Sequence, residues 1–214
     1  MRYLTIALAK GRIAEKAAAL FERAGLDCSD LKKESRKLIF MDEINKVKFI
    51  LVKPADVPTY VEYGSADIGI VGKDVLLEEQ RDLYEPLDLK FAKCSMAVAG
   101  PVDEAFGERK AYKIATKYPN IALKYFSSIG MDIKIIKLSG SVELAPIIGL
   151  SDFIVDIVET GSTLKENGLE IKDIIMPISA RLVVNKASMK LENKRIMDII
   201  GNLDRVIRGR GIDD

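Results

Sequence analysis

The segment from Ser151 to Leu169 holds residues whose types and spacing suit a chemical role. An apolar run at 153–158 carries one carboxylate, Asp156, and leads into a turn that opens a helix. That turn reads Glu159, Thr160, Gly161, Ser162, Thr163. Glycine allows close approach of the backbone to an anion, and the unpaired amides of a helix start point to the same place. The pattern predicts a phosphate cradle, with Asp156 and Glu159 facing a ribose or its metal ion.

An ordinary strand-to-helix turn is the alternative interpretation of this segment. A Thr or Ser acting as N-cap explains the hydroxyls, but it does not explain the two acids that flank an anion site. The segment is not a Walker loop, because no Gly-Lys-Ser/Thr follows, and it lacks the three-glycine spacing of a dinucleotide fingerprint.

A second candidate lies near the start of the chain, where Lys10, Gly11 and Arg12 join an expected strand to an expected helix. Two cations beside the positive end of a helix are unfavourable unless an anion lies between them. The alternative is that both side chains extend into water, at a cost of about 0.3 to 1 kcal/mol. Gly11 again permits close backbone contact, so anion binding is the favoured interpretation.

A turn at Ser139–Glu143 repeats the logic of the first motif. Ser141 is either a ligand or no more than an N-cap, and Glu143 would point into the turn. Thr116 and Lys117 form a third, weaker candidate. Arg36 could reach the same ligand, but an isolated arginine is more often a surface residue, so chemistry alone does not select it.

Composition limits the classes of function. The chain has 214 residues, 48% of them apolar, which is enough for one large α/β domain or two small lobes. The formal charge of +1 gives no overall field for nucleic acid or for an anionic membrane, so neither partner is expected. Histidine is absent, which excludes imidazole acids or bases, His-type metal sites and Ser-His-Asp triads.

Cellular location is inferred from the two cysteines and the N-terminus. Cys28 and Cys94 lack metal-ligand spacing and are interpreted as buried reduced thiols, with a disulfide as the minor alternative. The first residues lack the features of a secretory signal, and no segment approaches membrane-spanning length. A cytoplasmic protein is expected.

Hydrophobic periodicity predicts two successive sets of strands and helices. The predicted strands cover residues 3–8, 37–41, 47–52, 67–72, 94–99, 113–115, 133–138, 153–158 and 178–184, and the pattern restarts after residues 84–89. The predicted helices cover residues 13–24, 54–63, 120–129, 142–148 and 190–208. Because no Gly/Ser-rich linker separates the sets, we expect two α/β lobes between which the chain crosses more than once, with a cleft at the carboxyl ends of the strands.

Four segments together resemble the ATP phosphoribosyltransferase family over essentially the whole chain: AKGR, YGSADIGIVGKDVL, SGSVELAPIIGLSDFIVDIVETGSTLKENGL and ISARLVVNK. The resemblance implies a glycosyltransferase that moves the phosphoribosyl group of phosphoribosyl pyrophosphate to N1 of ATP and releases pyrophosphate. This reaction is the first step of histidine biosynthesis. Mg²⁺ bound through the substrate phosphates is implied as the cofactor, and no metal held by the protein alone.

The same resemblance implies the architecture and the partner. It predicts an α/β, two-lobed fold like type II periplasmic binding proteins, with the active site in the inter-lobe cleft. The first lobe is expected at 1–90 plus 177–214 and the second at 91–176. The chain looks like the short form of the family, without a histidine-sensing domain, which is paired in a hetero-oligomer with a regulatory subunit similar to histidyl-tRNA synthetase.

Carried across residue by residue, the resemblance assigns catalytic roles to Lys10, Arg12 and Asp156. The expected substrate-binding residues are Gly11, Arg36, Ser141, Glu143, Glu159, Thr160, Gly161, Ser162, Thr163 and Leu164. Two rival classes are weighed beside the enzyme. One is a solute-binding protein of the same two-lobed fold that captures a small anion, and the other is a regulatory nucleotide-binding module.

Overall fold

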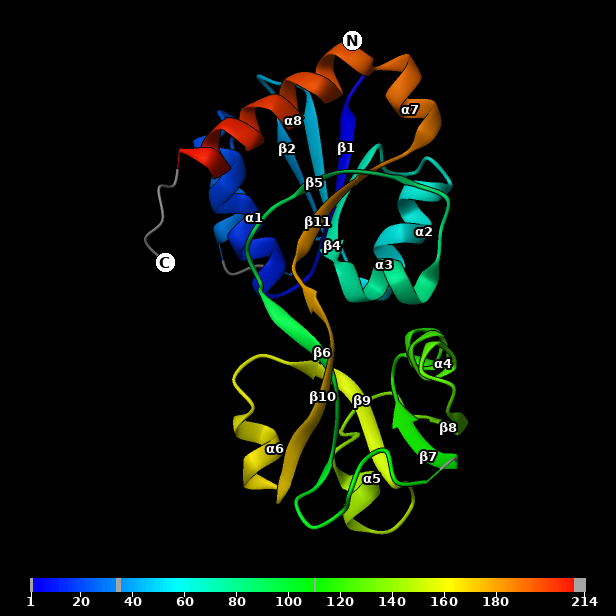
Figure 1. Cartoon of the computed structure of the whole chain (residues 1–214). Helices are drawn as coiled ribbons and strands as arrows, with labels where there is room; N and C mark the ends of the chain where they lie inside the picture. Colours follow the sequence, from blue (N-terminus) through cyan, green and yellow to red (C-terminus); the bar gives the residue numbers. More distant parts are fainter. Residues whose placement is uncertain (1, 34–35, 110, 210–214) are drawn as a thin grey trace. The chain divides into compact units, whose positions relative to one another are not determined.

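The chain forms two compact units, each built on its own β-sheet (Figure 1). The computed structural model describes residues 2–33, 36–109 and 111–209. Met1–Ala92 and Ser179–Asp214 make up the first unit, and Lys93–Ile178 makes up the second. The mixed α/β class predicted from the sequence is confirmed, with strands of one sheet drawn from both sides of the second unit in the sequence.

The first unit contains a six-stranded sheet of order β2-β3-β1-β4-β11-β5. Its strands are β1 Leu4–Ala9, β2 Ile39–Asp42, β3 Val47–Val52, β4 Ile68–Gly72, β5 Tyr84–Asp88 and β11 Ala180–Val184. β1 is parallel to β3 and β4, whereas β2, β5 and β11 each run antiparallel to their neighbours. The carboxyl ends of β1, β3 and β4 therefore lie at one edge of this sheet.

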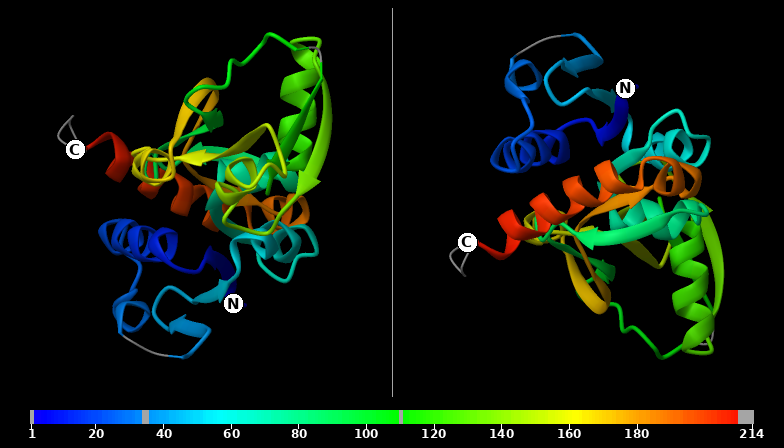
Figure 2. Two further views of the ribbon diagram at one scale, coloured as in Figure 1. Left: turned by 90° about the horizontal axis from the view of Figure 1, so that it is seen from below. Right: turned by 90° about the horizontal axis from the view of Figure 1, so that it is seen from above.

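Helices cover both faces of that sheet. They are α1 Arg12–Arg23, α2 Val57–Glu62, α3 Lys73–Glu79, α7 Lys186–Leu191 and α8 Asn193–Arg208, with short 3₁₀ turns at Ser29–Lys32 and Pro54–Asp56. Leu4, Ile6 and Leu8 of β1 pack in one core with α1 and α8, while Ala7 and Ala9 pack in another core with α2. α1 and α8 lie side by side, as both views of Figure 2 show. The alternation along β1 thus builds two cores from one strand.

α1 ends at a glycine signal that is visible in the sequence. Gly25 has φ 95°, its N–H donates to Glu22 O at 3.0 Å, and Leu26 N–H donates to Phe21 O at 3.0 Å. These two bonds are those of the Schellman motif, which satisfies the last carbonyls of a helix.

The second unit contains a five-stranded sheet of order β10-β6-β9-β7-β8. Its elements are β6 Cys94–Pro101, β7 Ala111–Thr116, α4 Pro119–Ser128, β8 Asp132–Lys137, α5 Leu144–Ile147, β9 Phe153–Val158, α6 Ser162–Glu166 and β10 Leu169–Ile178. β7 is parallel to β8 and β9, and β6 runs antiparallel to β9 and β10. The carboxyl ends of β7, β8 and β9 share one edge.

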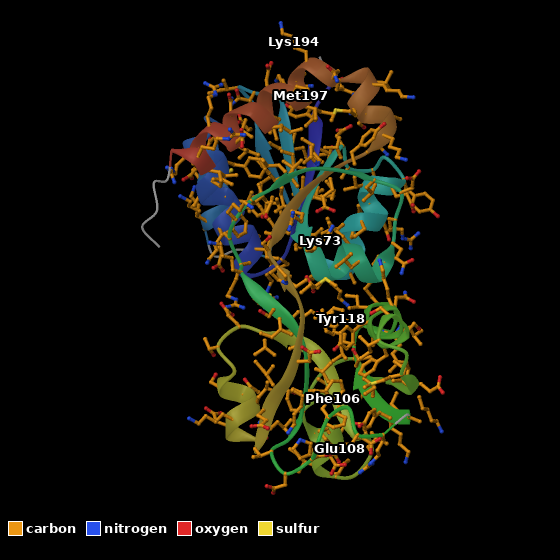
Figure 3. All side chains as sticks on the ribbon, in the orientation of Figure 1. Lys73, Phe106, Glu108, Tyr118, Lys194 and Met197 are labelled. Atoms are coloured by element: carbon orange, nitrogen blue, oxygen red, sulfur yellow. The ribbon has the colours of Figure 1, made fainter. Side chains whose placement is uncertain are left out.

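Different side chains cover the two faces of the second sheet. On one face, aromatic rings pack edge to face. The ring centroid of Phe106 (Figure 3) lies 5.3 Å from that of Phe153 and 6.1 Å from that of Phe126. The other face packs small and aliphatic residues against α5 and α6, including Ala97, Ile154 and Val158.

Two predicted elements differ from the structure. The strand predicted at 178–184 is present as β11, but it begins at Ala180, because Ser179 separates it from the longer β10, which periodicity did not reveal. β10 has irregularities between Ile171 and Asp173 and again between Ile174 and Met176, and such bulges disrupt the alternation by which a strand is recognised. The predicted single helix at 190–208 is two helices, α7 and α8, divided at Glu192.

Across the described ranges, no helix combines the length and the apolar character needed to cross a membrane.

Candidate functional site

Basic residues gather at the edge of the first sheet where its parallel strands end. Lys10 follows β1, Lys53 follows β3 and Lys73 follows β4, each as the next residue. Lys10 N–H donates to Val52 O at 2.9 Å, which holds the ends of β1 and β3 together. The side chains of Lys10 and Lys53 are exposed, whereas Lys73 (Figure 3) is half-buried and lies 2.5 Å from a carboxylate oxygen of Glu85.

Arg36 lies at the same edge. β2 runs antiparallel to β3, so its amino end lies beside the carboxyl end of β3, and Leu51 N–H donates to Leu38 O at 2.9 Å. Arg36 precedes Leu38 by two residues and is exposed. The structure therefore brings Lys10, Arg12 and Arg36 to one edge together with Lys53, and we call these four residues the cationic edge.

Gly11 has a backbone conformation that side chains do not tolerate. Its φ is 99° and its ψ is −151°, a region occupied almost only by glycine. A Cβ built on Gly11 would have no heavy atom within 4 Å, so backbone geometry and not crowding selects the glycine. Gly11 is the N-cap of α1, no described side chain caps this helix, and Arg12 is its first residue. The start of α1 is thus suited to an anion.

The turn after β9 has the local features that the sequence predicted. Gly161 is in the left-handed conformation with φ 76° and is the N-cap of α6. Lys165 N–H donates to Gly161 O at 3.0 Å, so the amides of residues 162–164 precede the first hydrogen bond of the helix. We call Glu159–Leu164 the amide turn.

The side-chain contacts of the amide turn decide between the two interpretations of this segment, helix capping and anion binding. Thr160 Oγ1 lies 3.0 Å from Ser162 Oγ and accepts a long hydrogen bond of 3.4 Å from Ser162 N–H. Plain capping by Ser or Thr is wrong as an explanation, since the N-cap is Gly161. The side chain of Leu164 is buried against the apolar face of the sheet, which leaves only its backbone for a ligand.

Asp156 lies in β9 two residues before the strand ends and is half-buried. Ile154 and Val158 flank it on the face that packs against α5 and α6, and Ala97 of β6 is its cross-strand neighbour. Ile157 N–H donates to Asp156 Oδ1 at 2.8 Å. The residue opposite the carboxylate in the strand pair is therefore small.

Two other turns, after β8 and after β7, lie at the same edge of the second sheet, and their hydroxyl groups differ in their contacts. Ser141 is exposed with φ 47°, an uncommon conformation for a residue other than glycine, and the N-cap of α5 is Glu143. The interpretation of Ser141 as an N-cap is therefore wrong. Thr116 is buried, its hydroxyl donates to Val155 O at 2.6 Å and accepts from Tyr118 N–H at 2.8 Å, so the weakest candidate has a structural role.

Sequence reasoning missed Lys53 and gave Lys73 no site role. The available signal was positional, because each lysine directly follows an apolar strand that the structure shows to be parallel to β1. Recognising it required knowledge of which strands are parallel, since only parallel neighbours end at the same edge.

Comparisons with known proteins identify related chains. A family model described as HisG: ATP phosphoribosyltransferase matches residues 53–205. The ATP phosphoribosyltransferase of Ruminiclostridium cellulolyticum is 58% identical over 99% of this chain and 100% of its own length. That of Caldanaerobacter subterraneus subsp. tengcongensis is 57% identical over 98% of this chain and 100% of its own.

Solved structures give the same relationship. A chain of the ATP phosphoribosyl transferase (HisG:HisZ) complex from Thermotoga maritima is 40% identical, with a TM-score of 0.83 over 98% of this chain and 100% of that one. The alkanesulfonate-binding protein SsuA from Xanthomonas axonopodis pv. citri, bound to MOPS, has a TM-score of 0.61 at 15% identity, over 96% of this chain and 73% of that one. The second likeness concerns the fold alone.

Proposed function

Because this chain belongs to the ATP phosphoribosyltransferase family, we infer that the cationic edge and the amide turn bind the substrates of that reaction. The enzyme transfers the phosphoribosyl group of phosphoribosyl pyrophosphate to N1 of ATP and forms phosphoribosyl-ATP and pyrophosphate, the first step of L-histidine biosynthesis. A pure solute-binding protein or a regulatory nucleotide module is not favoured, since the full-length relatives are enzymes by name.

The amide turn binds the phosphate of the phosphoribosyl group in this proposal. The observation that carries it is the conformation of Gly161, with amides of 162–164 that precede the first helical hydrogen bond and hydroxyls of Thr160, Ser162 and Thr163 beside them. Backbone N–H groups of this kind carry no formal charge, yet they bind a phosphate through their hydrogen bonds. Asp156 and Glu159, at either side of the strand end, then accept hydrogen bonds from the ribose hydroxyls.

The cationic edge stabilises the departing pyrophosphate. Adenine N1 carries a lone pair, so attack on the anomeric carbon needs no general base, and a chain without histidine suffices. The ribose gains oxocarbenium character as the leaving group gains negative charge. Lys10 and Arg12 oppose that charge, and Gly11 lets the backbone approach it. Catalysis is then positioning together with electrostatic stabilisation.

The remaining assignments concern binding. Arg36 adds a cation near the phosphates, a role supported by its position beside the end of β3. Ser141 and Glu143 bind hydroxyl or phosphate groups at the edge they share with the amide turn, supported by the exposed Ser141 in its left-handed conformation. Lys53 belongs with Lys10 by the same geometric argument.

The substrates bind at the carboxyl ends of the parallel strands, where each unit contributes its own groups. Two features support this assignment. The highly charged donor needs both cations and amides, which different units supply, and the fold is similar to that of an alkanesulfonate-binding protein. Ligands of open α/β sheets bind at the carboxyl ends of strands.

Mg²⁺ is the proposed cofactor and is held mainly through substrate phosphates. Among the residues that the structure describes, no group of three or more Asp, Glu, Cys or His could hold a metal. Mg²⁺ commonly combines one or two carboxylates with phosphate oxygens and water, and Asp156 or Glu159 could supply such a carboxylate. When bound, the ion neutralises phosphate charge.

The proposed partner is a regulatory subunit similar to histidyl-tRNA synthetase, in a hetero-oligomer. Its support is the HisG:HisZ complex of Thermotoga maritima, whose matched chain is covered completely by this one. We also propose a cytoplasmic location, supported by two cysteines that are not joined in a disulfide; Cys28 is buried as expected, whereas Cys94 is only half-buried. Burial raises the pKa of the Cys28 thiol to about 12, so this thiol stays protonated near neutrality.

Pyrophosphate release tests the proposed function. The purified chain is incubated with ATP, phosphoribosyl pyrophosphate and Mg²⁺, alone and with the synthetase-like subunit. We expect pyrophosphate and phosphoribosyl-ATP in equal amounts, dependent on both substrates and abolished by EDTA. Substrate binding without either product, in the presence of the subunit, would refute the function.

A further inference from the structure

Lys73 (Figure 3) directly follows β4, at the edge of the first sheet where β1 and β3 also end. β1 is parallel to β4, and their register, continued past its last pair, places Lys10 level with Gly72. Neighbouring strands of a sheet lie about 4.8 Å apart. The backbone of Lys73 is therefore close to that of Lys10, and a 3.0 Å hydrogen bond from Lys73 N–H to Ser179 O fixes it there.

The side chain of Lys73 extends away from Lys10. In the sheet, β4 has β1 on one side and β11 on the other, and β5 lies beyond β11. Lys73 Nζ lies 2.5 Å from Glu85 Oε2 of β5, so the ammonium group is directed across β11. A cation whose backbone lies at this edge is thus paired with a carboxylate away from it.

Glu85 belongs to a network in which cations outnumber carboxylates. Arg181 Nη1 lies 3.5 Å from Glu85 Oε1, and Arg181 Nη2 lies 3.4 Å from Asp88 Oδ2. Lys90 Nζ lies 2.7 Å from the same oxygen of Asp88. Together with the Lys73 pair, these contacts join three cations to two carboxylates. One cation can therefore leave without the cost of an unpaired carboxylate.

Arg181 has hydrogen-bonding capacity that its present contacts do not use. Both of its Nη contacts are longer than an ordinary hydrogen bond. Its buried Nε has no hydrogen-bond partner among the residues that the structure describes. A guanidinium can bind one carboxylate through two parallel hydrogen bonds, which are stronger than a single long contact. Arg181 can therefore hold Glu85 once Lys73 has left.

We propose that Lys73 is a further substrate-binding cation beside the cationic edge, which leaves Glu85 to Arg181 and binds a pyrophosphate group of the substrate or product. The inference rests on the proposed function, since that function brings pyrophosphate to this edge. Pyrophosphate carries more negative charge than one carboxylate, and the flexible lysine stem lets the ammonium group turn from one anion to the other. Arg181 and Glu85 are positioning residues in this exchange.

Calorimetric titration of the purified chain with inorganic pyrophosphate, in the presence of Mg²⁺, tests the exchange. Lys73→Gln should raise Kd about tenfold, as expected for loss of one charged hydrogen bond. Glu85→Gln should lower Kd about two- to fivefold, because a partly exposed ion pair no longer competes with the ligand. The double variant Lys73→Gln/Glu85→Gln should lose this gain, whereas a general effect of removing one negative charge would persist in it.

Glu62→Gln is the matched control for Glu85→Gln. The Glu62 side chain is 29% exposed, against 28% for Glu85, and its carboxylate pairs with Arg81 at 2.9 Å in the same unit. Its Kd for pyrophosphate should equal that of the wild type. Thermal unfolding verifies that every variant is folded.

Arg181→Gln tests the positioning role. It should raise Kd, because Lys73 is then the only cation of the network left to pair with Glu85. The same substitution should have no effect in the Glu85→Gln background. A role of Arg181 in stability alone would not produce this dependence on Glu85.

Lys10→Ala separates this inference from the proposed function. If Lys10→Ala weakens pyrophosphate binding and Lys73→Gln does not, the inference is wrong and the proposed function stands. The inference is also wrong if the double variant keeps the full gain of Glu85→Gln. A wild type that binds no pyrophosphate would overturn both the inference and the assignment of the leaving group to the cationic edge.

Discussion

The cationic edge of the first unit and the amide turn of the second end parallel strands in the same manner, yet they present different chemistry. Three strands of the first sheet are each followed by a lysine, whereas β8 and β9 lead into turns of glycine, serine and threonine. Side-chain cations act over several ångströms and adapt to a moving charge, while backbone amides act at contact and from fixed positions. A leaving pyrophosphate suits the first arrangement, and a retained phosphate suits the second.

The largest expected effect comes from the cationic edge. Arg12→Ala or Lys10→Ala should lower kcat by about 100- to 1000-fold, the usual consequence of removing one group that stabilises transition-state charge. The free energy of unfolding should change little, because both side chains are exposed. Steady-state kinetics of pyrophosphate release, with urea unfolding in parallel, measures both quantities.

Lys16→Ala is the matched control for these two variants, because Lys16 is exposed on α1 one turn beyond Arg12. It should retain kcat within about twofold, since surface substitutions away from special features change little. If all three variants had the same activity, the distinction between the cationic edge and the rest of α1 would be lost.

A smaller and more selective effect is expected at the other strand end. Asp156→Asn should lower kcat/KM for phosphoribosyl pyrophosphate by about 10- to 100-fold, as expected for loss of one charged hydrogen bond at about 1.5 to 3 kcal/mol. kcat/KM for ATP, at saturating donor, should fall less. Initial rates over a grid of both substrates give the two constants, and equal losses for both would contradict a ribose contact.

Gly11 tests whether the first strand end depends on backbone geometry. Gly11→Ala should reduce the free energy of unfolding by about 1 to 3 kcal/mol, because φ of 99° is strained for alanine although the space is open. Gly140→Ala is the control, since its Cβ would also meet nothing within 4 Å and its φ is not in the left-handed region. Urea unfolding of both variants separates the effect of backbone strain from that of adding a methyl group. Equal stability of the two variants would refute strain at position 11.

The sequence was sufficient for local features that depend on neighbours in the chain. The turn after Val158, the glycine turns before the helices at Gly11 and Gly161, and the helix end at Gly25 all follow from residue types at short spacing, although that Gly11 and Gly161 are themselves the N-caps was not predicted. The apolar strands β1 and β4 were equally clear, because continuous burial gives continuous apolar runs, and β9 departs from this pattern only at Asp156 and Ile157.

Features that depend on strand pairing were not predictable. The bulges of β10 respond to its pairing with β6, and the joint position of Arg36 and Lys53 depends on β2 and β3 lying beside β1. Arg36 was selected only through the family resemblance, for the same reason. The roles of the individual site residues stay predictions that the variants above test.

The first unit presents exposed cations at its cationic edge, whereas buried carboxylates stabilise it elsewhere, and acid should weaken that stabilisation. Burial raises the pKa of the Asp67 carboxyl, but hydrogen bonds from Arg2, Ser188 and Thr5 N–H outweigh this effect, so the net pKa lies below its ordinary value. Arg2 donates at 2.7 and 3.1 Å, Ser188 at 2.6 Å and Thr5 N–H at 2.8 Å. The pKa of Asp42 is also lowered, because hydrogen bonds from Asn45, Asp27 and Ile44 exceed the opposing effect of burial.

A carboxyl whose pKa is lower in the folded state contributes stability above its unfolded pKa of about 3.9, and that contribution disappears as the pH falls through the folded value. The contribution of these two groups to the free energy of unfolding, measured with urea, should therefore change little between pH 7 and pH 5. Below about pH 4 the free energy of unfolding should fall. Asp67→Asn should flatten the acid limb of this profile, because asparagine cannot titrate, while Asp198→Asn at an exposed position of α8 should preserve it. Superimposable acid limbs for Asp67→Asn and the wild type would show that the Arg2, Ser188 and Thr5 contacts do not favour the ionised carboxylate in the folded protein.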